Sequence, residues 1–431
     1  MRWVALSTLA IVVLAAVAWL ASRYWPLPTA QRQALERVQA PLPAPSGANA
    51  FGGLWLLPYD DATDAQREAV LRQDIGNARP VGTQGAHAVW GSAAEGVYPR
   101  APMATSPCDA SGVGCLQRVR EQAAQVAQAH AGHAQLHARI DALATASHYR
   151  SVFPPDSPVT FPPFQGLFER LPAHALAHVN GDSALALQGL CTDARTGRML
   201  LAQSDLLIAA MVGNALIERS AQLFAEILAE LPASQPLPAG CRAVFAPPQV
   251  DELRLCSAML GEMAFFREGL VMSRSDGSWM LLDERRTLAR VAPLFAQGCT
   301  DARAQLLAQD LPIAAVVPEG RWQCVANPVG CAVSDIAHPA YPDYFRRAQD
   351  AGATLRMSAA LLWLRDQQAA TGTGTAALLE QLPPALRSPQ RPIVLGPDGR
   401  SLQVRRYAIP NNGRAATIQL ALPAPAPATR R

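Results

Sequence analysis

One apolar run near the N-terminus constrains this chain most strongly. Residues 4–21 read VALSTLAIVVLAAVAWLA and carry no charge. A helix of about 18 residues rises roughly 27 Å, at the lower end of what crosses the hydrocarbon layer of a bilayer. Trp19, Tyr24 and Trp25 lie at the end of the run, where aromatic rings suit the headgroup zone. The sequence therefore predicts a transmembrane helix within residues 1–25.

A cleaved secretory signal peptide is the alternative interpretation of this run. Ala16-Val17-Ala18 offers a site of the A-x-A type, but a cut there would divide the apolar run. We therefore expect an uncleaved signal anchor. Either interpretation exports the rest of the chain, so we expect a single-pass protein of the bacterial inner membrane with its body in the periplasm. A second apolar run of this length is missing, which disfavours a multi-span transporter.

The eight cysteines support export, because disulfides persist in oxidising compartments. They allow 105 pairings, so the sequence alone cannot fix the connectivity. Short flexible segments favour Cys108–Cys115, a turn favours Cys241–Cys256, and CVANPVGC favours Cys324–Cys331. These choices leave Cys191 with Cys299. The alternative is free buried thiols, which behave as small apolar side chains.

The composition defines the architecture that follows the anchor. Half of the residues are hydrophobic, 16% are charged and the net charge is +3, which is enough apolar surface for a large core. We expect a Pro- and Ala-rich spacer over residues 26–48 that holds the body off the membrane. A helical body follows over 49–380, then a small β appendage over 381–422 and a disordered tail over 423–431. The fold is predicted to be mainly α, a solenoid-like or irregular bundle with a small C-terminal β-hairpin.

Two stretches carry most of the secondary-structure signal. Residues 115–147 are rich in Ala, Gln and Leu with apolar positions three and four apart, which predicts continuous helical structure. Near the C-terminus, two β-like runs flank the turn Pro397-Asp398-Gly399. Residues 415–422 are a candidate third strand.

Histidines are the candidate metal ligands. His130, His133 and His137 fall on one stripe of the predicted helix, and His174 and His178 are four residues apart on another. Seven residues of helix span about 10.5 Å, so the three could not all bind one ion there. A zinc or copper site would then need ligands from both groups of histidines. The alternative is a set of exposed histidines without function.

Carboxylates in apolar surroundings are the candidate catalytic groups. Glu262 lies in an apolar helical stretch, and Asp205 and Glu218 flank another. Burial raises the pKa of a carboxyl group, which suits a general acid, but such acids more often pair with arginine. A hydrolase would use these three carboxylates together with His174 or His178. The GDS triplet is interpreted as a turn between two helices with Asp182 or Ser183 as the N-cap, rather than as a site with Ser183 as the nucleophile. Nucleotide, dinucleotide and HExxH motifs are missing, and no cofactor is predicted.

Several segments together resemble an uncharacterised family of exported, membrane-anchored helical proteins from proteobacteria. The matching segments are NAFGGLWLL (49–57), CDASGVGCL (108–116), LLAQSDLLIAAMVGNAL (200–216), LCSAMLGE (255–262), NPVGCAVSDIAHPAYPDYFRRAQD (327–350) and LPPALRSPQRPIVLGPDGRSL (382–402). The resemblance implies the helical architecture and a Pro-rich entry into a short hairpin. It implies no activity.

These observations favour a non-enzymatic protein-binding module, because amphipathic helices are present without a catalytic motif. Its partner would be another envelope or secreted protein, as for an immunity or inhibitor protein or an envelope assembly factor. A periplasmic hydrolase and a metal-binding protein are the alternatives. Export and the weak net charge disfavour a nucleic-acid partner.

Overall fold

The computed structural model describes residues 2–40, 44–78, 91–103, 106–108, 113–153, 161–272, 280–316, 318, 320–408 and 415–423. The predicted mainly α fold is confirmed, with one small sheet near the C-terminus. The α-helices are α1 (Arg2–Tyr24), α2 (Thr29–Gln39), α3 (Phe51–Trp55), α4 (Asp64–Asn77), α5 (Cys115–Glu121), α6 (Ala123–His130), α7 (Ala134–Leu143), α8 (Arg170–Val179), α9 (Ser183–Ala202), α10 (Leu207–Glu230), α11 (Cys241–Val244), α12 (Cys256–Met272), α13 (Glu284–Ala296), α14 (Asp301–Ala308), α15 (Pro328–Ala337), α16 (Tyr341–Thr371) and α17 (Thr375–Glu380).

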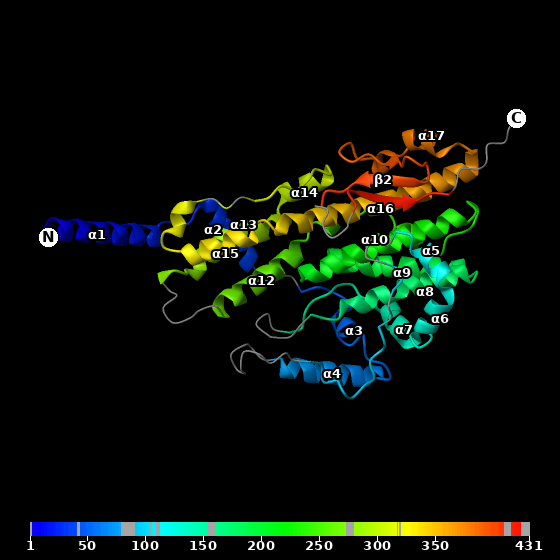
Figure 1. Ribbon diagram of the computed structural model, residues 1–431, viewed down its shortest axis with the longest axis horizontal. Helices are drawn as coiled ribbons and strands as arrows, with labels where there is room; N and C mark the ends of the chain where they lie inside the picture. The colour runs from blue at the N-terminus through cyan, green and yellow to red at the C-terminus, as the bar shows by residue number, and fades with distance from the viewer. Residues whose placement is uncertain are drawn as a thin grey trace.

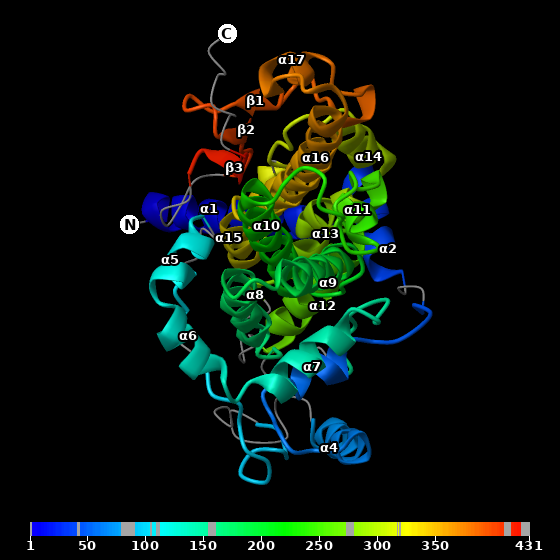
Figure 2. The ribbon, with the colours of Figure 1, turned by 90° about the vertical axis from the view of Figure 1, so that its right-hand side faces the viewer.

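The α9–α10 hairpin forms the centre of the body, and α16 packs along α10 (Figure 1). A four-residue connection joins α9 to α10, so the two helices run antiparallel. Their backbones approach closely where Gly197 faces Gly213. A Cβ atom at position 213 would lie 2.5 Å from the Gly197 carbonyl oxygen, so glycine is required there. Viewed end-on, α8 and α12 lie beside this pair, and α5 and α6 flank α8 (Figure 2).

Helix α1 projects from the body at the end that holds α2, α13 and α15 (Figure 1). Trp3–Tyr24 is long and apolar enough to cross a membrane, and none of its most apolar stretch is buried. This helix fits a single-pass anchor or a signal sequence. Together with the disulfides it indicates an exported protein in an oxidising compartment.

Helix α2 corrects the prediction that residues 26–48 are a spacer. Thr29–Gln39 forms a helix whose apolar side packs against α13. Ala34, Leu35 and Val38 recur three and four residues apart and are each at most 8% exposed. Prolines flank the helix, and their abundance suggested an extended linker, but the ten residues after Thr29 contain none. The start of the body therefore follows α1 directly.

The cysteines form four disulfides, and two of the predicted pairs are confirmed: Cys108–Cys115 and Cys324–Cys331. The other two predictions are wrong, because the bonds are Cys191–Cys241 and Cys256–Cys299. Helix α11, which begins at Cys241, packs on α9, which carries Cys191. Cys256 begins α12 beside the 3-10 turn (Gln297–Cys299) that follows α13. Helix packing therefore decided the partners, not nearness along the chain.

The C-terminal sheet is antiparallel with the order β1 (Val394–Leu395), β2 (Ser401–Arg405) and β3 (Thr417–Ala421). The predicted turn joins β1 to β2, and the candidate third strand is present. Alternate residues of β2 and β3 point inward onto α10 and α16: Leu402, Val404, Ile418 and Leu420, each at most 1% exposed. Because these side chains belong to the main core, the sheet completes the body and is not a separate appendage.

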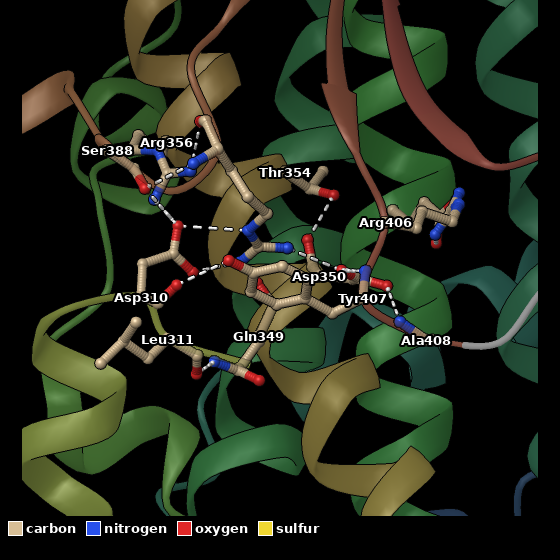
Figure 3. Close-up of polar contacts among 12 residues, drawn as sticks. Asp310, Leu311, Gln349, Asp350, Thr354, Arg356, Ser388, Arg406, Tyr407 and Ala408 are labelled. Atoms are coloured by element: carbon tan, nitrogen blue, oxygen red, sulfur yellow. Dashed lines mark hydrogen bonds and ion pairs between the residues drawn. The ribbon is translucent and has the colours of Figure 1, made fainter. Parts of the chain in front are cut away.

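A buried arginine fastens this C-terminal region to the helices. Arg391, 1% exposed, donates to Asp350 at 2.7 Å and to both carboxylate oxygens of Asp310. Its guanidinium group lies 3.8 Å from the centre of the Tyr407 ring, and the Tyr407 hydroxyl donates to the backbone carbonyl of Asp310. Figure 3 shows Asp310, Asp350 and Tyr407 converging from three parts of the chain.

Candidate metal centre

Three histidines converge where α6 passes into α7. His130 ends α6, His133 precedes α7 and His137 lies one turn into α7. Each offers a ring nitrogen, and the three nitrogens lie within 4.8 Å of one another. His133 is fully buried, while His130 and His137 are partly exposed. The cluster therefore has a closed inner side and an open outer side.

The geometry corrects the prediction that these residues share one straight helix. The chain leaves the helical path at Ala131-Gly132, and the backbone of His133 is not helical, with φ −93° and ψ 10°. The bend turns α7 onto α9 while α6 stays on α8. It also shortens the reach from His130 to His137, so all three can face one point. Gly132 is the signal in the sequence, because glycine inside a helix costs about 1 kcal/mol relative to alanine.

Burial keeps His130 and His137 in the neutral form that binds metals. Burial is the largest cause that lowers the pKa of His130 to about 4, and the neighbouring His133 adds to it. The pKa of His137 also falls to about 4, through burial first and then through Arg170 and the nearby histidines. Both imidazoles are therefore neutral at pH 7. A neutral imidazole presents a lone pair to a metal ion.

Two ring nitrogens in the cluster have no partner among the described residues. The Nε2 atoms of His133 and His137 are buried and make no hydrogen bond there. Leaving a buried polar atom unpaired costs about 1–3 kcal/mol. The only ring-to-ring polar contact of the cluster that is resolved joins the Nδ1 atoms of His130 and His133 at 3.1 Å. One of these two Nδ1 atoms donates and the other accepts, and a cation bound to the cluster would replace that contact.

Charged side chains of α7, α8 and α9 lie beside the cluster. Arg170 is 5% exposed and contacts Asp141 at 2.7 Å and Asp193 at 3.1 Å. Asp193, fully buried, also contacts Nε2 of His174 at 3.0 Å. Two carboxylates therefore face one guanidinium group beside the histidines. Their excess negative charge offsets the repulsion between Arg170 and a bound cation.

The spacing fits coordination by zinc or copper after small side-chain adjustments. Zinc binds imidazole nitrogen at about 2.0–2.1 Å in tetrahedral geometry, which places ligand atoms roughly 3.3 Å apart. The nitrogens here lie within 4.8 Å. A tetrahedral zinc site would therefore require the three nitrogens to move closer together. If the three histidines bound zinc, they would leave a fourth coordination position for another ligand.

The candidate catalytic carboxylates do not form one site with the histidines. Glu218 accepts hydrogen bonds from Arg406, as expected for a structural acid. Asp205 accepts from the Ser151 backbone N–H at 3.2 Å, and burial raises its pKa to about 6. Burial also raises the pKa of Glu262, on α12. His174 instead pairs with Asp193.

His178 does form a chain of hydrogen bonds with a serine and an acid. Its Nδ1 lies 2.8 Å from the Ser183 hydroxyl, and its Nε2 lies 3.0 Å from the Glu230 carboxylate. Arg120 holds that carboxylate with two further bonds. Asp182 caps α9 by accepting from the Leu185 N–H, as the N-cap interpretation predicted.

This arrangement is poorly suited to acyl transfer. An oxyanion next to Ser183 would need the N–H groups at the start of α9, where the Asp182 side chain already accepts. The negative charge of the Asp182 carboxylate would also repel the oxyanion. The contacts therefore favour a structural role, joining the α8–α9 turn to the end of α10.

Comparison with models of known families, with curated proteins and with solved structures finds no match to this chain. The resemblance to exported proteobacterial proteins stays a prediction. Function is therefore argued from the site itself.

Proposed function

We propose that this protein binds a divalent transition-metal ion, Zn²⁺ or Cu²⁺, through His130, His133 and His137. The convergence of three ring nitrogens within 4.8 Å carries the proposal. Imidazole suits both ions, and copper binds such ligands more tightly than zinc. The open fourth position leaves room for water or for a ligand from another molecule. We infer a role in metal handling outside the cytoplasm.

The proposed place of this activity is the periplasmic face of the bacterial inner membrane. Helix α1 would cross the membrane once, and the disulfide-bonded body would lie in the periplasm. The length and exposure of α1 support this placement, as do the four disulfides. The predicted binding of an envelope or secreted protein remains a separate hypothesis.

Metal titration of the full chain tests the proposal. The protein is purified in detergent without a histidine tag, stripped with a chelator and titrated with Zn²⁺ and Cu²⁺ by calorimetry. We expect one ion per chain. Replacing His133 by glutamine removes the most buried ligand, and we expect it to weaken binding at least tenfold. A stoichiometry near zero for both ions in the wild type would overturn the proposal.

His148→Gln is the matched control. His148 is also buried, but its Nδ1 contacts the adjacent Ser147 hydroxyl and it lies outside the cluster. This variant should bind metal as the wild type does. Equal loss in both variants would show that the ion binds elsewhere or that binding follows general stability. Circular dichroism establishes that each variant is folded before titration.

A further inference from the structure

The junction between α1 and the body is held by specific hydrogen bonds. Ser22 is fully buried; its hydroxyl donates to the Trp322 carbonyl at 2.8 Å and accepts from the Ala326 N–H at 3.1 Å. Arg286 donates to the backbone carbonyls of Arg23 and Trp25. The last turn of α1 is therefore fixed to the body without a flexible linker.

A contact one turn earlier sets the depth of the body relative to α1. The Trp19 indole N–H donates to the Met280 carbonyl at 3.2 Å. Trp19 belongs to the apolar run, which ends at Ala21. With a rise of about 1.5 Å per residue, Met280 lies level with the last turn of that run. Residues beside Met280 therefore reach the boundary of any membrane that α1 crosses.

Five large apolar side chains are exposed around this junction, and we call them the junction patch. They are Met280 (50% exposed), Leu281 (52%), Trp322 (44%), Val325 (43%) and Val329 (42%). Each of the five lies within three residues of Met280, Trp322 or Ala326, whose backbone groups form hydrogen bonds with α1. The Val329 N–H also donates to the Leu281 carbonyl at 3.1 Å, which connects the two segments. Exposed apolar groups gathered in this way mark a binding surface more often than a solvated one.

The junction patch is built as a fixed surface. Cys324–Cys331 joins the 3-10 turn (Arg321–Cys324) to α15. Asn327 accepts from the Asp283 N–H at 2.8 Å, which connects the same segment to the start of α13. Arg285 and Arg321 are exposed beside the patch and add positive charge. An apolar surface with arginines beside it matches the boundary between acyl chains and anionic headgroups.

We propose that the junction patch lies on the phospholipid leaflet from which α1 emerges. This inference rests on the proposed anchoring by α1 and extends it, because the body contacts the lipid itself. The occupant follows from position, because the five side chains belong to segments that contact α1 where its apolar run ends. Trp322 and the long arginines suit that interface. The patch also fixes the orientation of the body, with the histidine cluster on α6 and α7 directed away from the attachment.

Photo-crosslinking in a bilayer tests the proposal. The full chain carries a diazirine amino acid at one position and is reconstituted into nanodiscs of phosphatidylethanolamine and phosphatidylglycerol. After irradiation, lipid adducts are quantified by intact-mass spectrometry. We expect adducts at Leu281 and Val329 in at least fivefold excess over two exposed controls, Leu185 and Val394. These controls are 60% and 48% exposed and belong to α9 and β1.

A diazirine at Leu14, within α1, separates failure of the anchor from failure of the patch. Adducts at Leu14, Leu281 and Val329 support both proposals. Adducts at Leu14 with only control levels at Leu281 and Val329 overturn the lipid contact and leave the anchor standing. Control levels at all three positions overturn both.

Discussion

At the scale of residues, buried arginines organise much of this protein. All 37 basic residues are arginines, and several bind backbone carbonyls or paired carboxylates inside the fold. Arg365, 5% exposed, donates to the carbonyls of Leu228 and Leu231 and so completes the end of α10. A guanidinium group has five donors in a planar fork, which suits such sites better than a lysine would.

Replacing Arg391 by methionine should destabilise the protein by about 3–5 kcal/mol. The substitution keeps most of the side-chain volume but removes the charged partner that Asp310 and Asp350 share. Asp350, which is buried, is then left with hydrogen bonds from the Tyr407 and Ala408 backbone N–H groups, and a buried charge that loses its ion-pair partner is costly. Burial alone would raise the pKa of Asp310, but Arg391 and Arg356 outweigh it and lower that pKa. Urea unfolding followed by circular dichroism measures the loss. Arg400→Met, at an exposed position beside the β1–β2 turn, should change stability little, and a similar loss there would contradict the argument.

The histidine cluster should make stability depend on pH. His130 and His137 have pKa values of about 4 in the fold, compared with 6.5 ordinarily. Between these values the unfolded chain binds more protons than the folded one. Lowering the pH from about 6.5 to 4 therefore lowers the free energy of unfolding of the metal-free protein.

Urea unfolding with a chelator at several pH values in this range measures the effect. The double variant His130→Gln, His137→Gln should show a smaller fall in stability than the wild type. Asp205 titrates in both proteins with the opposite sign, because its pKa is raised, so the difference between them isolates the histidines. Equal slopes would contradict the low pKa values.

Among the secondary-structure elements, the breaks and contacts between helices produce the histidine cluster and the long-range disulfides. Residues 115–143 form three helices where the sequence predicted continuous helical structure, and the break at Gly132 gathers the histidines. Packing between helices also determines how four of the cysteines pair. Cys191–Cys241 joins α9 to α11, and Cys256–Cys299 joins α12 to the turn after α13.

Leu35→Ala should lower stability by about 2–3 kcal/mol, because α2 packs into the body. Leu35 is 8% exposed, and truncating a buried leucine costs about 2–5 kcal/mol, with the low end expected at the edge of a core. Gln33→Ala, on the exposed side of α2, should change stability by less than about 0.5 kcal/mol. Denaturation of both variants measures the difference. Equal stability in Leu35→Ala and the wild type would restore the interpretation of this segment as a spacer.

At the scale of the whole molecule, α1 and the body form one continuous structure. At the end of α1, Ser22 donates a hydrogen bond to the Trp322 carbonyl and Arg23 forms an ion pair with Asp283. The sheet closes the opposite side of the body on α10 and α16. The histidine cluster and the junction with α1 therefore belong to a single scaffold.

We expect the protein isolated from bacterial membranes to keep α1. A cut after Ala18 would remove most of the apolar run and leave Trp19 as the first residue of the chain. The protein would then appear in the soluble periplasmic fraction. Intact-mass measurement of both fractions distinguishes the outcomes: the whole-chain mass in the membrane fraction supports the anchor, and a shortened soluble form contradicts it.

Local features of this protein follow from its amino-acid pattern alone. Apolar periodicity predicts the helices, the run of residues 4–21 predicts the exposed helix α1, and the turn at Pro397-Asp398-Gly399 predicts the hairpin. The two disulfides that close short segments were also predictable. These features depend on interactions between residues close in the chain, so the pattern of residue types is sufficient.

Contacts between residues distant in the chain depend on how the helices pack together. This packing placed α2 on α13, paired Cys191 with Cys241, and bent the chain at Gly132 so that three histidines share one point. It also brought Met280 and Trp322 to the end of α1. Each of these contacts depends on which apolar faces pack against each other across the core. Many pairings bury similar area, and only packing of the complete set of helices selects one.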